Sequence, residues 1–486
     1  MNQIGLSVAQ YYMIIDILIA IAVAIFIFNI YRHFFVSHKL KEHQNKEYLW
    51  WSLVGFVVVF CFWIFTSIPT NTGNFTIFFA IIIALSPLAI MLALFLVFMR
   101  FWMDFRRAEF FLKQGFTMVE IRLPKEMVKS PASMELFLTA LHQTSGEGGW
   151  FGRYWYGKTR AWFSLELVSI EGQVHFFIWM RKRFKEFISA SLYAQFPGIE
   201  VHDAVDYARS VHYDPKTMEI WAADFEFKKE DAYPIMTYVD YGLDKDPKEE
   251  FKVDPMAPVI EFLGSIGGNQ QAWIQILVRA YKKSDHFEPG RIFRGYDKRA
   301  KEAEKIVNKM HKRDPKTKVA GELIEGMTFS KMPRITKGEE EIISAIERNM
   351  TKLGFDVGIR CMYIAKKENF NSANPGAMQS IWKQYAAPHM NSLGTSDDLW
   401  FERIDMPWED RSGKMAEHYS RQALDMYKRR SYFFPPYTHI HGHIKPLIMS
   451  SESLATIYHF PGATVATPTL ARVPSKKGEA PANIPI

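Results

Sequence analysis

The sequence predicts an α+β protein with three N-terminal transmembrane helices followed by two ferredoxin-like (βαββαβ) modules, the second with a long basic helical insertion. Three observations predict this class: a long stretch without charge near the N-terminus, two helix starts with the same capping signal, and apolar runs paired around turn formers. The predicted domains are residues 1–104, 105–210, 211–430 with the insertion at 282–354, and an extended Pro-rich segment at 431–486.

No charged residue occurs from Tyr48 to Met99, which is 52 positions, whereas about 20 suffice to cross a bilayer core. The turn formers at 69–74 divide this stretch, so spans are predicted at Tyr48–Ile68 and Phe75–Phe101, after a first span at Tyr11–Tyr31. Asp16 lies inside the first span, where an acid is either a proton or ion site or a group wetted by lipid headgroups.

Lysine and arginine predict the orientation of these spans. The loop after the first span and the region after the third are basic, and the turn at 69–74 has no basic residue. The positive-inside rule then places the N-terminus outside and the C-terminal domain in the cytoplasm. The basic residues are Arg32, Lys39, Lys41, Lys46, Arg100, Arg106, Arg107 and Lys113.

The first module is predicted from a strand at Val119–Leu123, a helix after Ser130-Pro131, a hairpin around Glu171-Gly172, a helix at 182–195 and a last strand at 199–208. Serine as N-cap and proline at the first helical position are typical of helix starts. The second module repeats the plan. Its elements are a strand at 219–228, a helix after Asp254-Pro255, strands at 272–280 and 357–365, and a helix at 373–385.

The insertion at 282–354 contains most of the basic excess. Residues 281–318 have 13 Lys/Arg against 6 Asp/Glu, and their net charge of +7 equals that of the whole chain. Basic arms bind nucleic acid, anionic lipid or acidic partners, although a solvated helix has the same composition. The candidate contacts are Lys298, Arg299, Lys301, Lys305, Lys309, Lys312 and Arg313, with Lys428, Arg429 and Arg430 beside a later aromatic run.

Residues 152–159 match the phosphate-loop pattern G-x-x-x-x-G-K-[ST] through Gly152, Gly157, Lys158 and Thr159. A working loop follows a buried strand and opens a helix, whereas an alternating, strand-like pattern follows here. We therefore interpret the match as a decoy and expect no cofactor. His439, His441 and His443 alternate and form a weak candidate metal site, with exposed histidines as the other interpretation.

The two cysteines, Cys61 and Cys361, are too few for a disulfide scaffold or a zinc finger. No Ser-His-Asp set, Cys-His pair or paired acids at a meaningful spacing occur, so no catalytic residue is predicted and the protein is expected not to be an enzyme.

Several stretches resemble the membrane-proximal, non-ATPase region of bacterial TraD-like and HerA/FtsK-like type IV secretion ATPases. They include Trp162–Glu166, Ala272–Arg279, Phe433–Tyr437 and Leu454–Pro461, with the tail Pro474–Pro485. In fused relatives such a tail leads into the motor, whereas this chain stops at Ile486. The resemblance implies a non-enzymatic adaptor in the bacterial inner membrane that docks a separately encoded P-loop ATPase during DNA or protein transfer.

The expected partners are the lipid bilayer, this ATPase, and further copies of the chain in a homo-oligomer. Nucleic acid or anionic lipid is a further candidate partner at the basic insertion. Two alternatives stay open: a membrane-bound nucleotide hydrolase that uses Gly152–Thr159, and a membrane scaffold unrelated to secretion.

Overall fold

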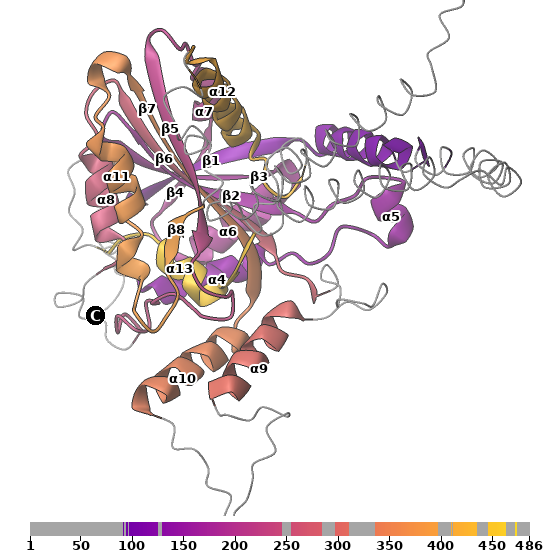
Figure 1. Cartoon of the computed structure of the whole chain (residues 1–486), viewed down its shortest axis with the longest axis vertical. Helices are drawn as coiled ribbons and strands as arrows, with labels where there is room; N and C mark the ends of the chain where they lie inside the picture. The colour runs from indigo at the N-terminus through magenta and orange to yellow at the C-terminus, as the bar shows by residue number, and fades with distance from the viewer. Residues whose placement is uncertain are drawn as a thin grey trace, which may run out of the picture. The chain divides into compact units, whose positions relative to one another are not determined.

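The computed structural model divides the chain into two units, Met1–Asp104 and Phe105–Ile486 (Figure 1). It describes residues 91, 94–95, 97–124, 129–244, 254–283, 297–310, 336–396, 410, 412–434, 446–462 and 472–473. The second unit contains every strand described below. The finer boundaries predicted at 210 and 430 stay predictions.

The predicted three-span anchor is contradicted. Within the described residues, no helix is both long enough and apolar enough to cross a bilayer. The predicted spans at Tyr11–Tyr31 and Tyr48–Ile68, most of the span at Phe75–Phe101, and Asp16 lie outside the described residues. This finding also contradicts the predicted multi-pass location in the bacterial inner membrane and the topology drawn from the positive-inside rule.

The strands described in the second unit form one sheet, in the order β10-β1-β3-β2-β6-β7-β5-β8. β4 pairs with β1 and β9 pairs with β7, and all pairs are antiparallel except β1 with β10. The strands are β1 (Phe116–Pro124), β2 (Trp162–Ile170), β3 (Gln173–Arg181), β4 (Glu200–Ala204), β5 (Met218–Phe227), β6 (Gln270–Ala280), β7 (Gly354–Lys366), β8 (Leu393–Thr395), β9 (Leu447–Ser450) and β10 (Arg472–Val473).

The prediction of two separate ferredoxin-like modules is wrong, because the two halves share this sheet. β2 and β6 pair along their length, from Trp162 opposite Arg279 to Ile170 opposite Gln271. In separate modules both strands would be edges with unpaired amides and carbonyls, and their pairing satisfies these groups. Both strands are buried on both faces, as central strands are.

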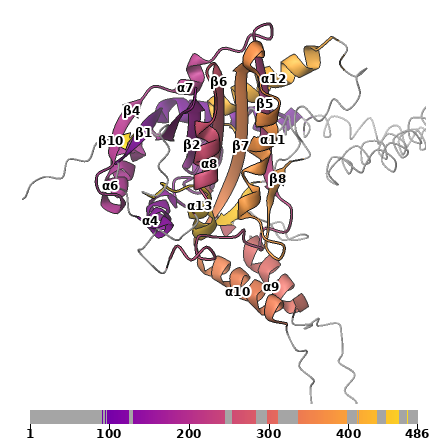
Figure 2. The same cartoon turned by 90° about the vertical axis from the view of Figure 1, so that its left-hand side faces the viewer.

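Helices cover both faces of the sheet (Figure 2). One face carries α4 (Pro131–Leu141), α6 (Lys185–Gln195), α8 (Ala257–Gly264), α11 (Ala373–Ser380) and α13 (Ser451–Ile457), whose apolar side chains share one core with both halves of the sheet. The opposite face carries α7 (Tyr207–Ser210) and α12 (Lys414–Arg429) over a second apolar cluster.

Local signals explain several of these elements. The Ser130 side chain accepts a hydrogen bond from Ala132 N, and α4 begins at Pro131, as predicted. Glu171 and Gly172 both have positive φ, at 52° and 88°, which confirms the tight hairpin between β2 and β3. Thr336 and Glu339 form a reciprocal capping box at the start of α10.

The described residues of the insertion include two helices, as predicted for this region. These are α9 (Lys298–Met310) and α10 (Lys337–Thr351), which pack on each other through Ala303, Ile306 and Ile346. Both views show this pair projecting from the end of the sheet (Figures 1 and 2). We call α9 and α10 the arm.

Candidate functional site

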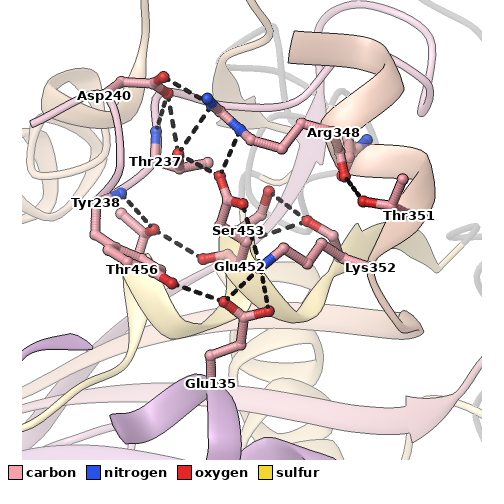
Figure 3. Close-up of polar contacts among 12 residues, drawn as sticks. Glu135, Thr237, Tyr238, Asp240, Arg348, Thr351, Lys352, Glu452, Ser453 and Thr456 are labelled. Carbon is pink, nitrogen blue, oxygen red and sulfur yellow. Dashed lines mark hydrogen bonds and ion pairs between the residues drawn. The ribbon is translucent and has the colours of Figure 1, made fainter. Parts of the chain in front are cut away.

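A network of charged side chains joins the arm to the helices on the sheet (Figure 3). Arg348 lies in the last turn of α10 and Lys352 follows its end, where cations interact favourably with the helix dipole. Lys352 Nζ lies 2.9 Å from Glu135 Oε1 on α4. The Arg348 guanidinium lies 2.7 Å from Asp240 Oδ1 and 3.1 Å from Glu452 Oε1 on α13.

Hydroxyl groups add hydrogen bonds to the two glutamates. Thr237 Oγ1 donates to Glu452 at 2.6 Å, while Ser451 Oγ and the Tyr238 hydroxyl donate to Glu135 at 2.9 and 2.7 Å. Glu452 is 3% exposed, and a buried carboxylate without partners would cost several kcal/mol. The cations and hydroxyls therefore make its burial tolerable.

The pKa values of two groups in the network are shifted by their surroundings. Burial, followed by the hydrogen bond to Glu135, raises the pKa of the Tyr238 hydroxyl. Burial opposes the charge of Arg348, but Asp240 and Glu452 outweigh it and raise the pKa of the guanidinium. Both shifts favour the forms that these groups hold at neutral pH. We call this network, which joins α10 to α4 and α13, the clamp.

The helix α13 is buried along its whole length, including its polar residues. The Ser450 hydroxyl caps it by accepting from Ser453 N. After its end, His459 Nε2 lies 3.0 Å from Asp254 Oδ1. Burial disfavours the charge of Asp254, but the interactions with His459 prevail and lower the pKa of the carboxyl. Leu454–Pro461, one of the stretches that carry the resemblance, thus lies in the core.

A cavity of about 670 Å³ lies along the arm side of the clamp. Acidic and basic side chains both face it, so its lining favours no one sign of charge. The lining residues are Met236, Asp240, Lys337, Glu340, Glu341, Ser344, Ala345, Arg348, Ala387, His389 and Met390.

The segment Gly152–Thr159, which matches the phosphate-loop pattern, does not open a helix as a phosphate loop does. The helix α5 (Trp150–Tyr154) ends before Gly157, and the next regular element is the strand β2. A Cβ added at Gly152 would lie 2.6 Å from the Glu147 carbonyl oxygen, and one at Gly157 would collide with the Arg106 backbone. The chain itself therefore fills the space in which a phosphate loop cradles its anion.

The last two residues of that pattern have contacts within the fold. Lys158 Nζ lies 5.6 Å from the ring centroid of Tyr156. The Thr159 hydroxyl accepts a hydrogen bond from the Arg181 guanidinium at 2.8 Å. These contacts favour a structural loop leading into β2.

The structure separates the basic candidates of the arm into two groups. Lys298 Nζ bonds Asp231 at 2.8 Å, and Arg299 is 5% exposed and donates to carbonyls at the end of α10. Their charges hold α9 in place. The exposed members on α9 are Lys301, Lys305 and Lys309, while Lys312 and Arg313 lie outside the described residues.

The other basic candidates lie at the end of α12. Lys428 Nζ donates to the Val211 carbonyl at 2.6 Å, and the Arg429 guanidinium donates to Asp425. Arg430 is 1% exposed. It is therefore not available at the surface to bind nucleic acid or lipid.

Arg430 belongs to a buried charged cluster that sequence reasoning missed. Its guanidinium donates to both carboxylate oxygens of Glu166, at 2.9 and 3.0 Å, and to both of Asp206. Burial raises the pKa values of Tyr207 and Tyr427. The Tyr207 hydroxyl donates to Glu166 and accepts a hydrogen bond from the Tyr427 hydroxyl. The signal was Glu166, the one charged residue of the buried strand β2.

The histidines His439, His441 and His443 lie outside the described residues. In the part of the chain that the structure describes, no three His, Cys, Asp or Glu side chains are grouped so as to hold a metal ion.

The comparisons with known proteins connect this geometry to one family. The model of the family described as Domain of unknown function (DUF8128) matches residues 107–472, which contain the sheet, the arm and the clamp. No curated protein matches the chain. Because the match covers well over half of the 486 residues, the chain belongs to the DUF8128 family.

Proposed function

We propose that the chain is a non-enzymatic adaptor that docks a separately encoded P-loop ATPase of a type IV secretion or conjugation-like transfer system. The resemblance of residues 117–486 to the non-ATPase region of the secretion motors suggests this partner. The proposal requires neither the predicted spans nor a membrane location.

The observation that carries the proposal is the place of β10. β10 pairs in parallel with the end of β1, with Arg472 opposite Leu123 and Val473 opposite Pro124. The segment from Pro474 to Ile486 therefore starts from a fixed edge of the sheet. A segment that resembles the linker to a motor, and that starts from a rigid body, is suited to guide a motor supplied in trans.

The loop at Gly152–Thr159 supports the adaptor over the nucleotide hydrolase. Its glycines contact the protein backbone, and a strand follows it where a phosphate loop needs a helix N-terminus.

The test is a pull-down with the full chain as bait, scored by the recovery of a P-loop ATPase. We expect deletion of Pro474–Ile486 to weaken recovery while the melting curve stays unchanged, because the deleted segment lies beyond β10. A matched variant with Pro474, Pro481 and Pro485 replaced by alanine keeps the length and shows whether the extended backbone matters. Undiminished recovery with the deletion would remove the tail from the proposed interface.

A further inference from the structure

We infer that the loop containing α5 is an interfacial anchor that inserts exposed aromatic side chains into the headgroup layer of an anionic phospholipid surface. This inference is independent of the proposed adaptor function. It concerns a surface contact made by one loop.

The loop presents an unusual density of exposed aromatic rings. Trp150 is 74% exposed, and Phe151, Trp155 and Tyr156 are each about half exposed. Scattered apolar residues need no explanation, but a cluster of this kind marks an interaction surface.

Ion pairs and a hydrogen bond fix the loop to the rest of the fold. The Glu147 carboxylate contacts Arg153 at 2.6 Å, Arg160 at 2.9 Å and Lys282 at 3.1 Å. Burial disfavours its charge, but Arg160 and the other cations prevail and lower its pKa. Arg106 Nε also donates to the Trp155 carbonyl at 2.6 Å. These contacts hold the aromatic rings in place before any partner arrives, which reduces the entropy lost on binding.

The charges around the rings are complementary to an anionic surface. Lys158 lies in the loop and Arg183 beside it, and both are exposed. The Arg183 guanidinium would lie 3.6 Å from a Cβ at Gly146. The acid of the loop, Glu147, is already neutralised by three cations. Each basic residue near an anionic bilayer contributes about 1 kcal/mol, equivalent to about fivefold in affinity.

The ring packing favours lipid over single-stranded nucleic acid. Phe151 and Trp155 stack on each other with centroids 5.8 Å apart and planes 11° apart, and Tyr156 meets Phe151 edge-on. Bases need open ring faces, which these contacts reduce. Tryptophan and tyrosine beside basic residues are instead typical of the boundary between headgroups and acyl chains.

The experiment places an environment-sensitive fluorophore at Ser145→Cys in the full chain, with Cys61→Ser in the background. Cys361 is fully buried and does not compete for the label. Ser145 is an exposed loop residue five positions before Trp150. The matched control is Ser265→Cys, which is also exposed. Its neighbour Ile266 lies beside Gly172, at the end of β2 far from the loop, and β2 spans about 30 Å.

We expect the label at 145, and not the label at 265, to shift to the blue with phosphatidylcholine vesicles that contain phosphatidylglycerol. Trp150→Ser with Phe151→Ser should abolish the shift without changing the circular dichroism spectrum. Lys158→Ala with Arg183→Ala should raise the lipid concentration at half-response about fivefold per charge removed.

Three results would overturn the inference. The first is no response at 145 to the anionic vesicles, and the second is an equal response at both labels. The third is a response at 145 to an oligothymidylate but not to vesicles, which would assign the loop to single-stranded nucleic acid.

Discussion

Replacing Arg430 by methionine removes the only cation that the described residues place against the carboxylate of Glu166. The change keeps much of the side-chain volume and leaves Glu166 buried, since that side chain is fully inaccessible to solvent. Removing one partner of a buried ion pair costs about 3–5 kcal/mol, mostly because the other charge loses its compensation. Its remaining donors set the value within that range.

Glu166 keeps three hydrogen bonds in the variant. The Ser164 and Tyr207 hydroxyls donate to it at 2.6 and 2.8 Å, and Gln275 Nε2 donates at 3.1 Å. These neutral donors still stabilise the charge of Glu166. We therefore expect the loss of its ion pair to lower the free energy of unfolding by about 3 kcal/mol. Arg430 also pairs with Asp206, whose side chain is 13% exposed. Losing this second ion pair should lower the free energy of unfolding by a further amount of about 1 kcal/mol or less, as for a partly exposed pair.

The assay is equilibrium urea unfolding of the full chain, followed by circular dichroism. The matched control is Arg429→Met at the adjacent position, where an exposed ion pair with Asp425 should be worth no more than about 0.5 kcal/mol. Adding Glu166→Gln to Arg430→Met should recover about 1 kcal/mol or more, because it removes the orphan charge. If Arg430→Met loses no more stability than Arg429→Met, the reasoning about the buried cluster is refuted.

Three further predictions concern separate parts of the fold. Lys158→Ala should leave nucleotide assays unchanged, and saturable ATP binding that this substitution abolishes would contradict the decoy interpretation. Gly358→Ala should lower stability by about 1–3 kcal/mol in urea unfolding, because its Cβ would lie 2.5 Å from a ring carbon of Tyr432, whereas the control Gly376→Ala, with open space in a helix, should gain about 0.5 kcal/mol. The Asp254 carboxyl has a lowered pKa in the folded protein. Its contribution to the free energy of unfolding is therefore present at pH values above its ordinary pKa of 3.8, and it is lost as the pH falls through the folded pKa. Asp254→Asn should flatten that part of an acid titration of stability, and an unchanged profile would exclude this carboxyl as its source.

The sequence predicted the elements that short-range chemistry determines. The cap at Ser130 and the turn at Glu171-Gly172 are encoded by neighbouring residues, and both occur where predicted. Strands predicted at 272–280 and 357–365 are observed as β6 and β7 with slightly longer bounds.

The joining of the two halves could not be read in the same way. Alternation in β2 marks it as a strand but does not say which strand lies beside it, so the pairing of β2 with β6 has no local signal. The clamp and the Arg430 cluster join residues more than 200 positions apart, such as Glu135 with Lys352 and Glu166 with Arg430. Only a buried acid within each apolar segment hints at such contacts.

The late position of α13 in the chain has a consequence for synthesis. Ser451 bonds Glu135 across 316 residues, and α13 fills the core beside α4. Because a ribosome adds about 5–20 residues per second, roughly 15–60 seconds pass between the synthesis of α4 and the synthesis of α13. During that time its apolar side chains have no cover from α13, and a nascent chain is open to aggregation or to chaperones. A premature stop before α13 would therefore yield an unfinished core.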